Sequence, residues 1–207
     1  MMKTLQVPSQ LWLTLITASF LTLGILPSYS LEATLVQLEN QESSTMKLRQ
    51  AEAHNNRGVE LAEEGRLAQA IAAFKQAINI YPSYENAHNN LGLALGSQNK
   101  FSEAAAAFNQ ALAINPSNVE TYNNLGIALG SQGKFPQAVA AFNQAIQIKP
   151  DEPTSYQNLG VAFWSQGRLP EAVTSLQKAK ELYLAQKNTE GVEHIEEILE
   201  QLKSPQQ

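Results

Sequence analysis

The stretch NNLGLALGSQNKFSEAAAAFNQALAINP at residues 89–116 returns almost unchanged as NNLGIALGSQGKFPQAVAAFNQAIQIKP at residues 123–150. The offset is 34 residues, and a glycine marks each of four successive copies, at Gly58, Gly92, Gly126 and Gly160. A fixed period of this length is typical of a solenoid, in which each unit buries its apolar face against its neighbours. The sequence therefore predicts four stacked units at 51–84, 85–118, 119–152 and 153–186.

Each unit is predicted to hold two helices, because apolar residues recur at helical spacing in two runs per period, such as 86–98 and 102–115. The turn between the two runs carries a glycine or asparagine, the residue types that most readily take the left-handed conformation that ends a helix. Prolines stand where second helices begin and after they end. The turn residues are Gly65, Asn99, Gly133 and Gly167, and the prolines are Pro136 and Pro170, then Pro82, Pro116 and Pro150. The predicted fold class is all-α.

The repeat resembles the tetratricopeptide repeat. Its residues in the third unit are Tyr122, Leu125, Gly126, Leu129, Ala138, Phe142, Ala145 and Pro150. The resemblance covers residues 51–186 and implies a right-handed superhelical solenoid of eight helices. In this family the first helices of the units line a concave groove that accepts an extended peptide or a helix.

The fourth unit departs from the pattern. In the fourth unit Leu176 replaces phenylalanine and Leu184 replaces the closing proline. Thr189 is a candidate N-cap for a further helix with an apolar stripe, and residues 187–207 are therefore predicted to form a C-terminal capping helix and tail. Residues 31–50 have a weaker pattern and are predicted to be a linker, either a flexible tether or a short loose helix.

The N-terminus has the pattern of a leader. Lys3 precedes the apolar stretch Leu11 to Leu26, which is followed by the small-residue pattern Ser28-Tyr29-Ser30. Residues 1–30 are predicted to be a signal peptide, with an uncleaved membrane anchor as the alternative. Either reading places the repeats on the exported side of a membrane, in a periplasm, a lumen or the medium.

Composition argues against several function classes. The 14 lysines and arginines are outnumbered by 19 acidic residues, giving a net charge of −5, so nucleic acid is not expected as a partner. The chain has no cysteine, and its histidines do not form a metal-ligand pattern: His54 and His88 lie one period apart. Neither catalytic residues nor a cofactor or metal are predicted, since four repeats leave no room for a catalytic domain.

Two rows of amides are the predicted binding residues. When the groove positions of the tetratricopeptide repeat family are placed on this sequence, the amide residues fall in two adjacent rows, with Trp164 near the end of the groove. An amide side chain can bond both the C=O and the N–H of a peptide backbone, so the rows predict a sequence-tolerant ladder for an extended ligand. The alternative is that the amides satisfy neighbouring backbone groups. The rows are Asn55, Asn89, Asn123 and Gln157, then Asn56, Asn90, Asn124 and Asn158.

The amide rows resemble the asparagine ladder in the repeat domain of O-linked N-acetylglucosamine transferase, without any part that resembles its catalytic domain. The two-carboxylate clamp of heat-shock co-chaperones is absent, because its basic positions here hold Asn55, Glu120 and Asn124. The sequence thus predicts a non-catalytic interaction module or scaffold that binds a peptide or helix, assisting assembly of an envelope complex. A membrane-anchored assembly factor and a self-associating structural protein are the alternatives.

Overall fold

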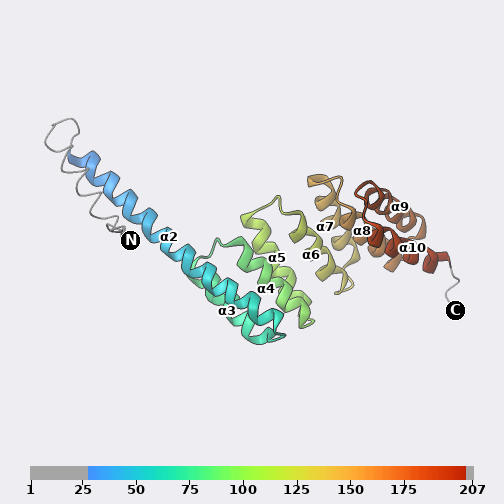
Figure 1. The fold of residues 1–207 in the computed structure, drawn as a ribbon, viewed down its shortest axis with the longest axis horizontal. Coiled ribbons are helices and arrows are strands. Elements are labelled where there is room, and N and C mark those ends of the chain that lie inside the picture. The colour runs from blue at the N-terminus through green and yellow to red at the C-terminus, as the bar shows by residue number, and fades with distance from the viewer. Residues whose placement is uncertain (1–27, 204–207) are drawn as a thin grey trace, which may run out of the picture. The chain divides into compact units, whose positions relative to one another are not determined.

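The computed structural model describes residues 28–203 of the 207-residue chain, and residues 50–203 form a solenoid of helices (Figure 1). The predicted leader stretch Leu11 to Leu26 lies outside the described residues. Residues 28–203 form nine helices: α2 (Ser28–Glu63), α3 (Leu67–Ile80), α4 (Glu85–Ser97), α5 (Phe101–Ile114), α6 (Val119–Gly130), α7 (Phe135–Ile148), α8 (Pro153–Ser165), α9 (Leu169–Ala185) and α10 (Thr189–Lys203). The all-α repeat solenoid predicted from the sequence is confirmed.

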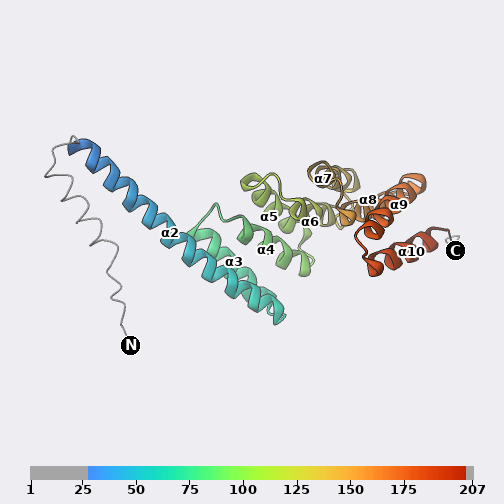
Figure 2. The ribbon, with the colours of Figure 1, turned by 45° about the horizontal axis from the view of Figure 1, so that its top comes forward.

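The helices pair as the repeat predicts. Helix α4 packs on α5, α6 on α7 and α8 on α9, and each pair also packs on the next one along the chain. Helices α3 to α10 follow one another in this order (Figures 1 and 2). Below, helices α4, α6, α8 and the last part of α2 are called the A helices, and α3, α5, α7 and α9 the B helices.

Residues 31–50, predicted to be a flexible tether or a short loose helix, lie within the continuous helix α2. The helix belongs to two compact units of the chain, which divide between Arg49 and Gln50. The stretch 31–50 contains neither glycine nor proline, so nothing in it breaks a helix once one has formed. Its side chains are mostly exposed, which explains why it shows no clear apolar stripe.

The turns inside the units have the predicted left-handed residue. Asn99 has a φ of 59°, and the three glycines at the equivalent positions have φ between 72° and 74°. The amide of Lys100 then donates to the carbonyl of Leu95 at 2.9 Å, which closes the end of α4. Lys187 also has a positive φ of 58° between α9 and α10, and the sequence reading missed this turn.

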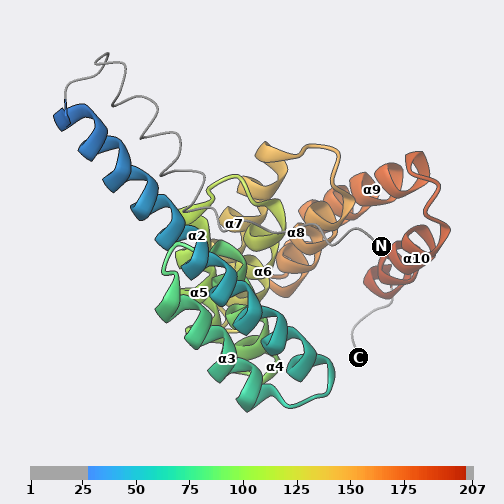
Figure 3. The same cartoon turned by 60° about the vertical axis from the view of Figure 1, so that its left-hand side comes forward.

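The capping helix is present, with a different cap from the predicted one. The amide of Gly191 donates to Oδ1 of Asn188 at 2.9 Å, so Asn188 and not Thr189 caps α10. Ile195 and Ile198 of the predicted stripe are buried against Leu176 and Tyr183 of α9. Figure 3 shows α10 alongside α9.

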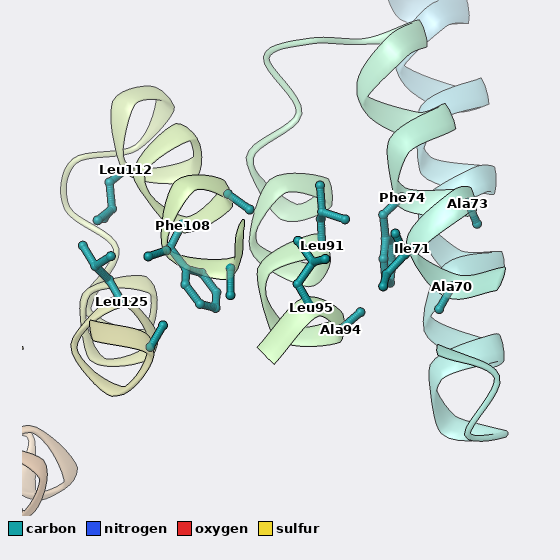
Figure 4. Close-up of a cluster of buried hydrophobic side chains, with 14 of the residues drawn as sticks. Ala70, Ile71, Ala73, Phe74, Leu91, Ala94, Leu95, Phe108, Leu112 and Leu125 are labelled. Atoms are coloured by element: carbon teal, nitrogen blue, oxygen red, sulfur yellow. The ribbon is translucent and has the colours of Figure 1, made fainter. Parts of the chain in front are cut away.

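The core depends on close contacts between a glycine and a ring in the same unit. A Cβ added at Gly92 would meet Cε1 of Phe108 at 2.5 Å, and Gly58 has the same relation to Phe74. The Phe108 ring lies against the A helix of its own unit and belongs to the same buried cluster as Leu91 and Leu95 (Figure 4). The buried cluster continues from Leu61 to Ala141 and so joins three units into one core.

The substitution Gly92→Ala should destabilise the fold, because the new methyl group overlaps the Phe108 ring and overpacking of this kind costs about 1–3 kcal/mol. The matched control is Gly96→Ala in the same helix, where an added Cβ meets nothing within 4 Å. Thermal unfolding followed by far-UV circular dichroism should show a lower midpoint for the first variant alone. Equal midpoints would contradict the proposed role of the contact.

Candidate peptide-binding groove

One face of the A helices forms a continuous surface. Helix α4 contacts α6, and α6 contacts α8, although a B helix separates each pair in the sequence. Residues one period apart therefore lie in rows across neighbouring A helices. Three rows matter here: two of amides and one of apolar side chains.

The first amide row holds the units together. Asn55 accepts a hydrogen bond from Asn90 Nδ2 at 2.9 Å, and Asn89 accepts one from the Thr121 hydroxyl at 3.2 Å. Asn123 Nδ2 donates to the Ser155 hydroxyl at 2.9 Å. Each bond crosses to the following unit, and Asn55 and Asn123 are buried. These amides are therefore tied to neighbouring side chains, which differs from the predicted ligand ladder.

Gln157, at the same position in the fourth unit, closes the row. It accepts a hydrogen bond from the Tyr183 hydroxyl at 3.0 Å. The bond joins α8 to α9, so this amide also serves the internal structure.

The second amide row faces a different environment. Asn56 is exposed, and Asn90 is half-buried and donates to Asn55. Asn124 and Asn158 are half-buried, yet each has an Nδ2 atom that is shielded from solvent and bonded to no group within residues 28–203. A buried donor without a partner costs about 1–3 kcal/mol. These two amides are the members of the second row with a buried, unpaired donor; in the first row, Asn123 Oδ1 is a buried acceptor without a partner among residues 28–203.

An apolar row beside these amides was not predicted. Leu93, Ile127 and Val161 occupy the same position in three successive units and are 41%, 50% and 39% exposed. Each follows an amide of the second row by three residues, a spacing that places both on one helix face. That spacing is the sequence signal for the row, and two of its members lie in the repeated segments GLALG (92–96) and GIALG (126–130).

Two cavities open on this face, and they are equivalent by the repeat. The one of about 320 Å³ lies between the second and third units, and the one of about 350 Å³ lies between the third and fourth. Ile127 lines both, as the far wall of one and the near wall of the other. Residues lining the first are Leu93, Gly96, Ser97, Phe101, Phe108, Asn124, Ile127 and Ala128, and each has its counterpart 34 residues later in the second.

A third cavity adjoins Ile127 on the side where the A helices begin. It is lined by Asn124 and Asn158, by the carboxylate of Glu120 and by the ion pair of Lys149 with Glu152 at 2.7 Å. The hydrogen bond that Lys149 Nζ donates to the Glu152 carboxylate raises the pKa of Lys149 above its usual value. Glu120 is exposed and has no hydrogen-bonding or charged partner among the described residues. The groove therefore offers amide donors and one free carboxylate.

Trp164 and the histidines lie outside the ligand-facing rows. Trp164 is half-buried and packs with the apolar cluster of α9 and α10, which corrects its assignment as a groove residue. The gain from burying its ring against the capping helix explains this position. His88 is buried, and its Nε2 lies 2.8 Å from the Pro82 carbonyl, so it supports the turn before α4.

Comparisons with known proteins agree with this architecture. A family model described as "Tetratricopeptide repeat" matches residues 89–153 and 123–187, and one described as "TPR repeat" matches residues 58–98. Together these matches span more than half of the chain. No curated protein matches it.

Three solved structures illustrate the similarity. A crystal structure of MamA is 27% identical, with a TM-score of 0.63, and the match covers 66% of this chain and 80% of that one. MamA residues 41 to the end from Desulfovibrio magneticus RS-1 is 19% identical, with a TM-score of 0.63 and coverage of 88% and 99%. The first repeat domain of Spaghetti (RPAP3), bound to the HSP90 peptide SRMEEVD, is 19% identical, with a TM-score of 0.56 and coverage of 58% and 95%. The last two show the fold alone.

Alanine substitution should affect the stability of the protein differently at the adjacent residues Asn123 and Asn124. Asn123→Ala removes the partner of the buried Ser155 hydroxyl and should cost about 1–3 kcal/mol of stability. Asn124→Ala removes a donor that has no partner, so the melting temperature should stay the same or rise. Thermal unfolding of the two variants checks this, and a clear loss of stability in Asn124→Ala would contradict the assignment.

Proposed function

Since this chain belongs to the tetratricopeptide repeat family, we propose that it binds an extended segment of another protein across its A helices and acts as a scaffold in assembling a larger complex. Repeats of this family are typically non-catalytic protein-interaction modules. The observation that carries the proposal is the coincidence of exposed apolar side chains with buried, unpaired amide donors on one face. We call this face, formed by Leu93, Asn124, Ile127, Asn158, Val161 and the cavities between them, the groove.

The amides of the groove favour a ligand that presents its peptide backbone. Asn124 and Asn158 are half-buried, so the exposed part of each amide can bond a peptide backbone, whereas their Nδ2 atoms are shielded from solvent and out of a ligand's reach. Burial of the apolar row by a ligand would add a favourable free energy of about 25 cal/mol per Å² of apolar surface removed from water. A small number of such contacts gives an expected dissociation constant in the micromolar range.

Charge selects against acidic ligands. Glu120 stands free at the edge of the groove, and the whole chain carries a net charge of −5. The related repeat domain that holds SRMEEVD binds an acidic peptide. Our chain has Asn55, Glu120 and Asn124 at the positions where the carboxylate clamp would need basic residues, so a peptide of that kind is not the proposed ligand. Nucleic acid is disfavoured for the same reason.

We place the protein on the exported side of a membrane, with the leader at residues 1–30 as support. None of the helices within residues 28–203 has the length and apolarity needed to span a bilayer. The proposal therefore rests on the sequence pattern from Lys3 to Ser30. An uncleaved anchor at Leu11 to Leu26 would tether the same groove to the membrane.

Replacement of Asn124 and Asn158 by alanine should weaken binding of the natural partner. The full-length tagged protein would be crosslinked in its own cells, and the variant Asn124→Ala with Asn158→Ala should lose specific partners seen with the wild type in mass spectrometry. Asn109→Ala with Asn143→Ala is the matched control, because these exposed asparagines lie one repeat apart on the B helices. A partner set that is the same for both double variants would refute binding through the groove.

Mass measurement of the protein recovered from its cells tests the leader. Cleavage after Ser30 should give a chain that begins at Leu31, three residues into α2. Retention of the whole N-terminus together with release by detergent alone would establish the anchored form. An intact chain in the cytosolic fraction would contradict export.

A further inference from the structure

The groove has borders of opposite charge. Helices α4, α6 and α8 contain no lysine or arginine, and their two acidic residues, Glu85 and Glu120, each lie in a first helical turn. The cations come from the turns that follow these helices, at Lys100, Lys134 and Arg168. The groove therefore has acidic residues where its A helices begin and basic residues where they end.

Two of these five charges are already engaged inside the chain. Arg168 forms an ion pair with Glu171 at 2.8 Å. The two carboxylate oxygens of Glu85 accept hydrogen bonds from the side-chain amides of Asn115 and Asn118. Arg168 and Glu85 therefore serve the internal structure, and the charge of the groove depends on the other three residues.

Glu120, Lys100 and Lys134 have no partner of opposite charge among residues 28–203, and all three side chains are exposed. Lys134 Nζ donates a hydrogen bond to Oε1 of Gln132 at 2.8 Å, but this amide is neutral and leaves the positive charge uncompensated. Exposed charges without a counterion in the chain are available to pair with charges on a bound partner.

Lys134 is held beside the cavity between the second and third units. Gln132, which accepts from the Lys134 ammonium group, donates from Nε2 to the carbonyls of Phe101 at 3.0 Å and Ala128 at 2.9 Å. Both of these residues line that cavity, and Lys100 directly precedes Phe101 in the chain. The two uncompensated cations thus border one cavity of the groove.

Glu120 borders the groove at the other end of α6. It lines the cavity at the start of the A helices together with Ile127, and Ile127 also lines the cavity beside Lys134. Helix α6 carries Glu120 in its first turn and ends at Gly130, four residues before Lys134. A segment that covers Ile127 therefore has a carboxylate on one flank and ammonium groups on the other.

Charges at these places also suit the ends of a helix. A carboxylate in the first turn of α6 and an ammonium group after its last turn each interact favourably with the helix dipole. The dipole explains the sign of each charge, but it does not explain why the exposed side chain of Ile127 and a cavity lie between them. The combination of these features indicates a binding surface.

We infer that the groove binds a protein segment whose apolar side chains cover Ile127, with basic residues on the flank that faces Glu120 and acidic residues on the flank that faces Lys100 and Lys134. The inference rests on the proposed function and narrows it to one class of partner. Complementary charges select a partner and fix its orientation, whereas like charges repel. A uniformly acidic segment is repelled at Glu120, and a uniformly basic one at the two lysines.

A phage-displayed library of random 12-residue peptides tests this charge pattern when it is selected on the full-length protein. The selection is done at low salt, where exposed charges are screened least. Peptides enriched on the wild type should combine apolar residues with at least one acidic and one basic residue. Attraction by the net charge of −5 alone would instead enrich uniformly basic peptides.

Charge reversal at each border should change the selected peptides in opposite directions. Glu120→Lys should replace basic by acidic residues among the enriched peptides, and Lys134→Glu should do the reverse. Synthetic copies of the peptides enriched on the wild type should bind each variant about fivefold more weakly in fluorescence anisotropy. Glu103→Lys and Lys75→Glu are the matched controls, because these exposed residues of the B helices change the net charge equally and line none of the three cavities.

Several outcomes would overturn the inference. They are enrichment of uniformly basic peptides on the wild type, enrichment of no peptide, and equal effects of the border and control variants. A role in helix stability alone would lower the melting temperature of a border variant and leave its selected peptides unchanged. A mass that doubles with concentration in the wild type and not in Glu120→Lys would assign the groove to a second copy of this chain, which also overturns the inference.

The proposed function has a separate readout. Partners lost selectively from the Asn124→Ala, Asn158→Ala variant in cells would still support a groove that binds a protein, even where the selected peptides show no charge pattern. Peptides that carry both charges, and that Glu120→Lys and Lys134→Glu weaken while the controls do not, would support the inference.

Discussion

The contact of a glycine with a ring is the constraint on which the other parts of the structure depend. At Gly58, Gly92 and Gly126 the missing Cβ leaves the space that the phenylalanine of the same unit occupies, and at Gly160 a leucine takes this place. The contact sets how closely the A and B helices approach. Because it recurs in every unit, all A helices turn the same face outward, and a row of equivalent side chains becomes a continuous surface.

Side-chain hydrogen bonds between the units add to this packing. Asn55, Asn89 and Asn123 each bond to a side chain of the following unit, and Gln157 bonds to Tyr183. Such bonds are directional, so they favour one rotation of a unit relative to the next, which apolar contacts alone define less sharply. The first amide row thereby fixes the alignment of the second row and of the apolar row beside it.

The sequence predicted the fold in detail and the groove only in part. Repeat period, helix pairs, turn residues and capping helix follow from local chemistry, since glycine, proline and apolar spacing act within one or two turns. The roles of Asn123 and Asn124 do not, because adjacent residues on a helix point about 100° apart, as 3.6 residues per turn require, and only the position of Ser155 shows which one bonds inward. Likewise the ring of Trp164 is equally suited to a ligand and to a capping helix, and the packing of α10 decides it. Helix α2 extends upstream because nothing in residues 31–50 breaks it, and an absence of breakers is a weaker signal than an apolar stripe.

The groove departs from the rule that buried polar groups are paired. Asn124 and Asn158 keep an unpaired Nδ2 atom out of water, although an alanine at either position would avoid that cost. Local inconsistencies of this kind are expected at functional sites. Both residues are half-buried, so a ligand in the groove would meet the exposed part of each amide, while the two Nδ2 atoms stay shielded. We expect a bound partner to raise the stability of the units on either side of Ile127, because it would bind the folded chain and not the unfolded one.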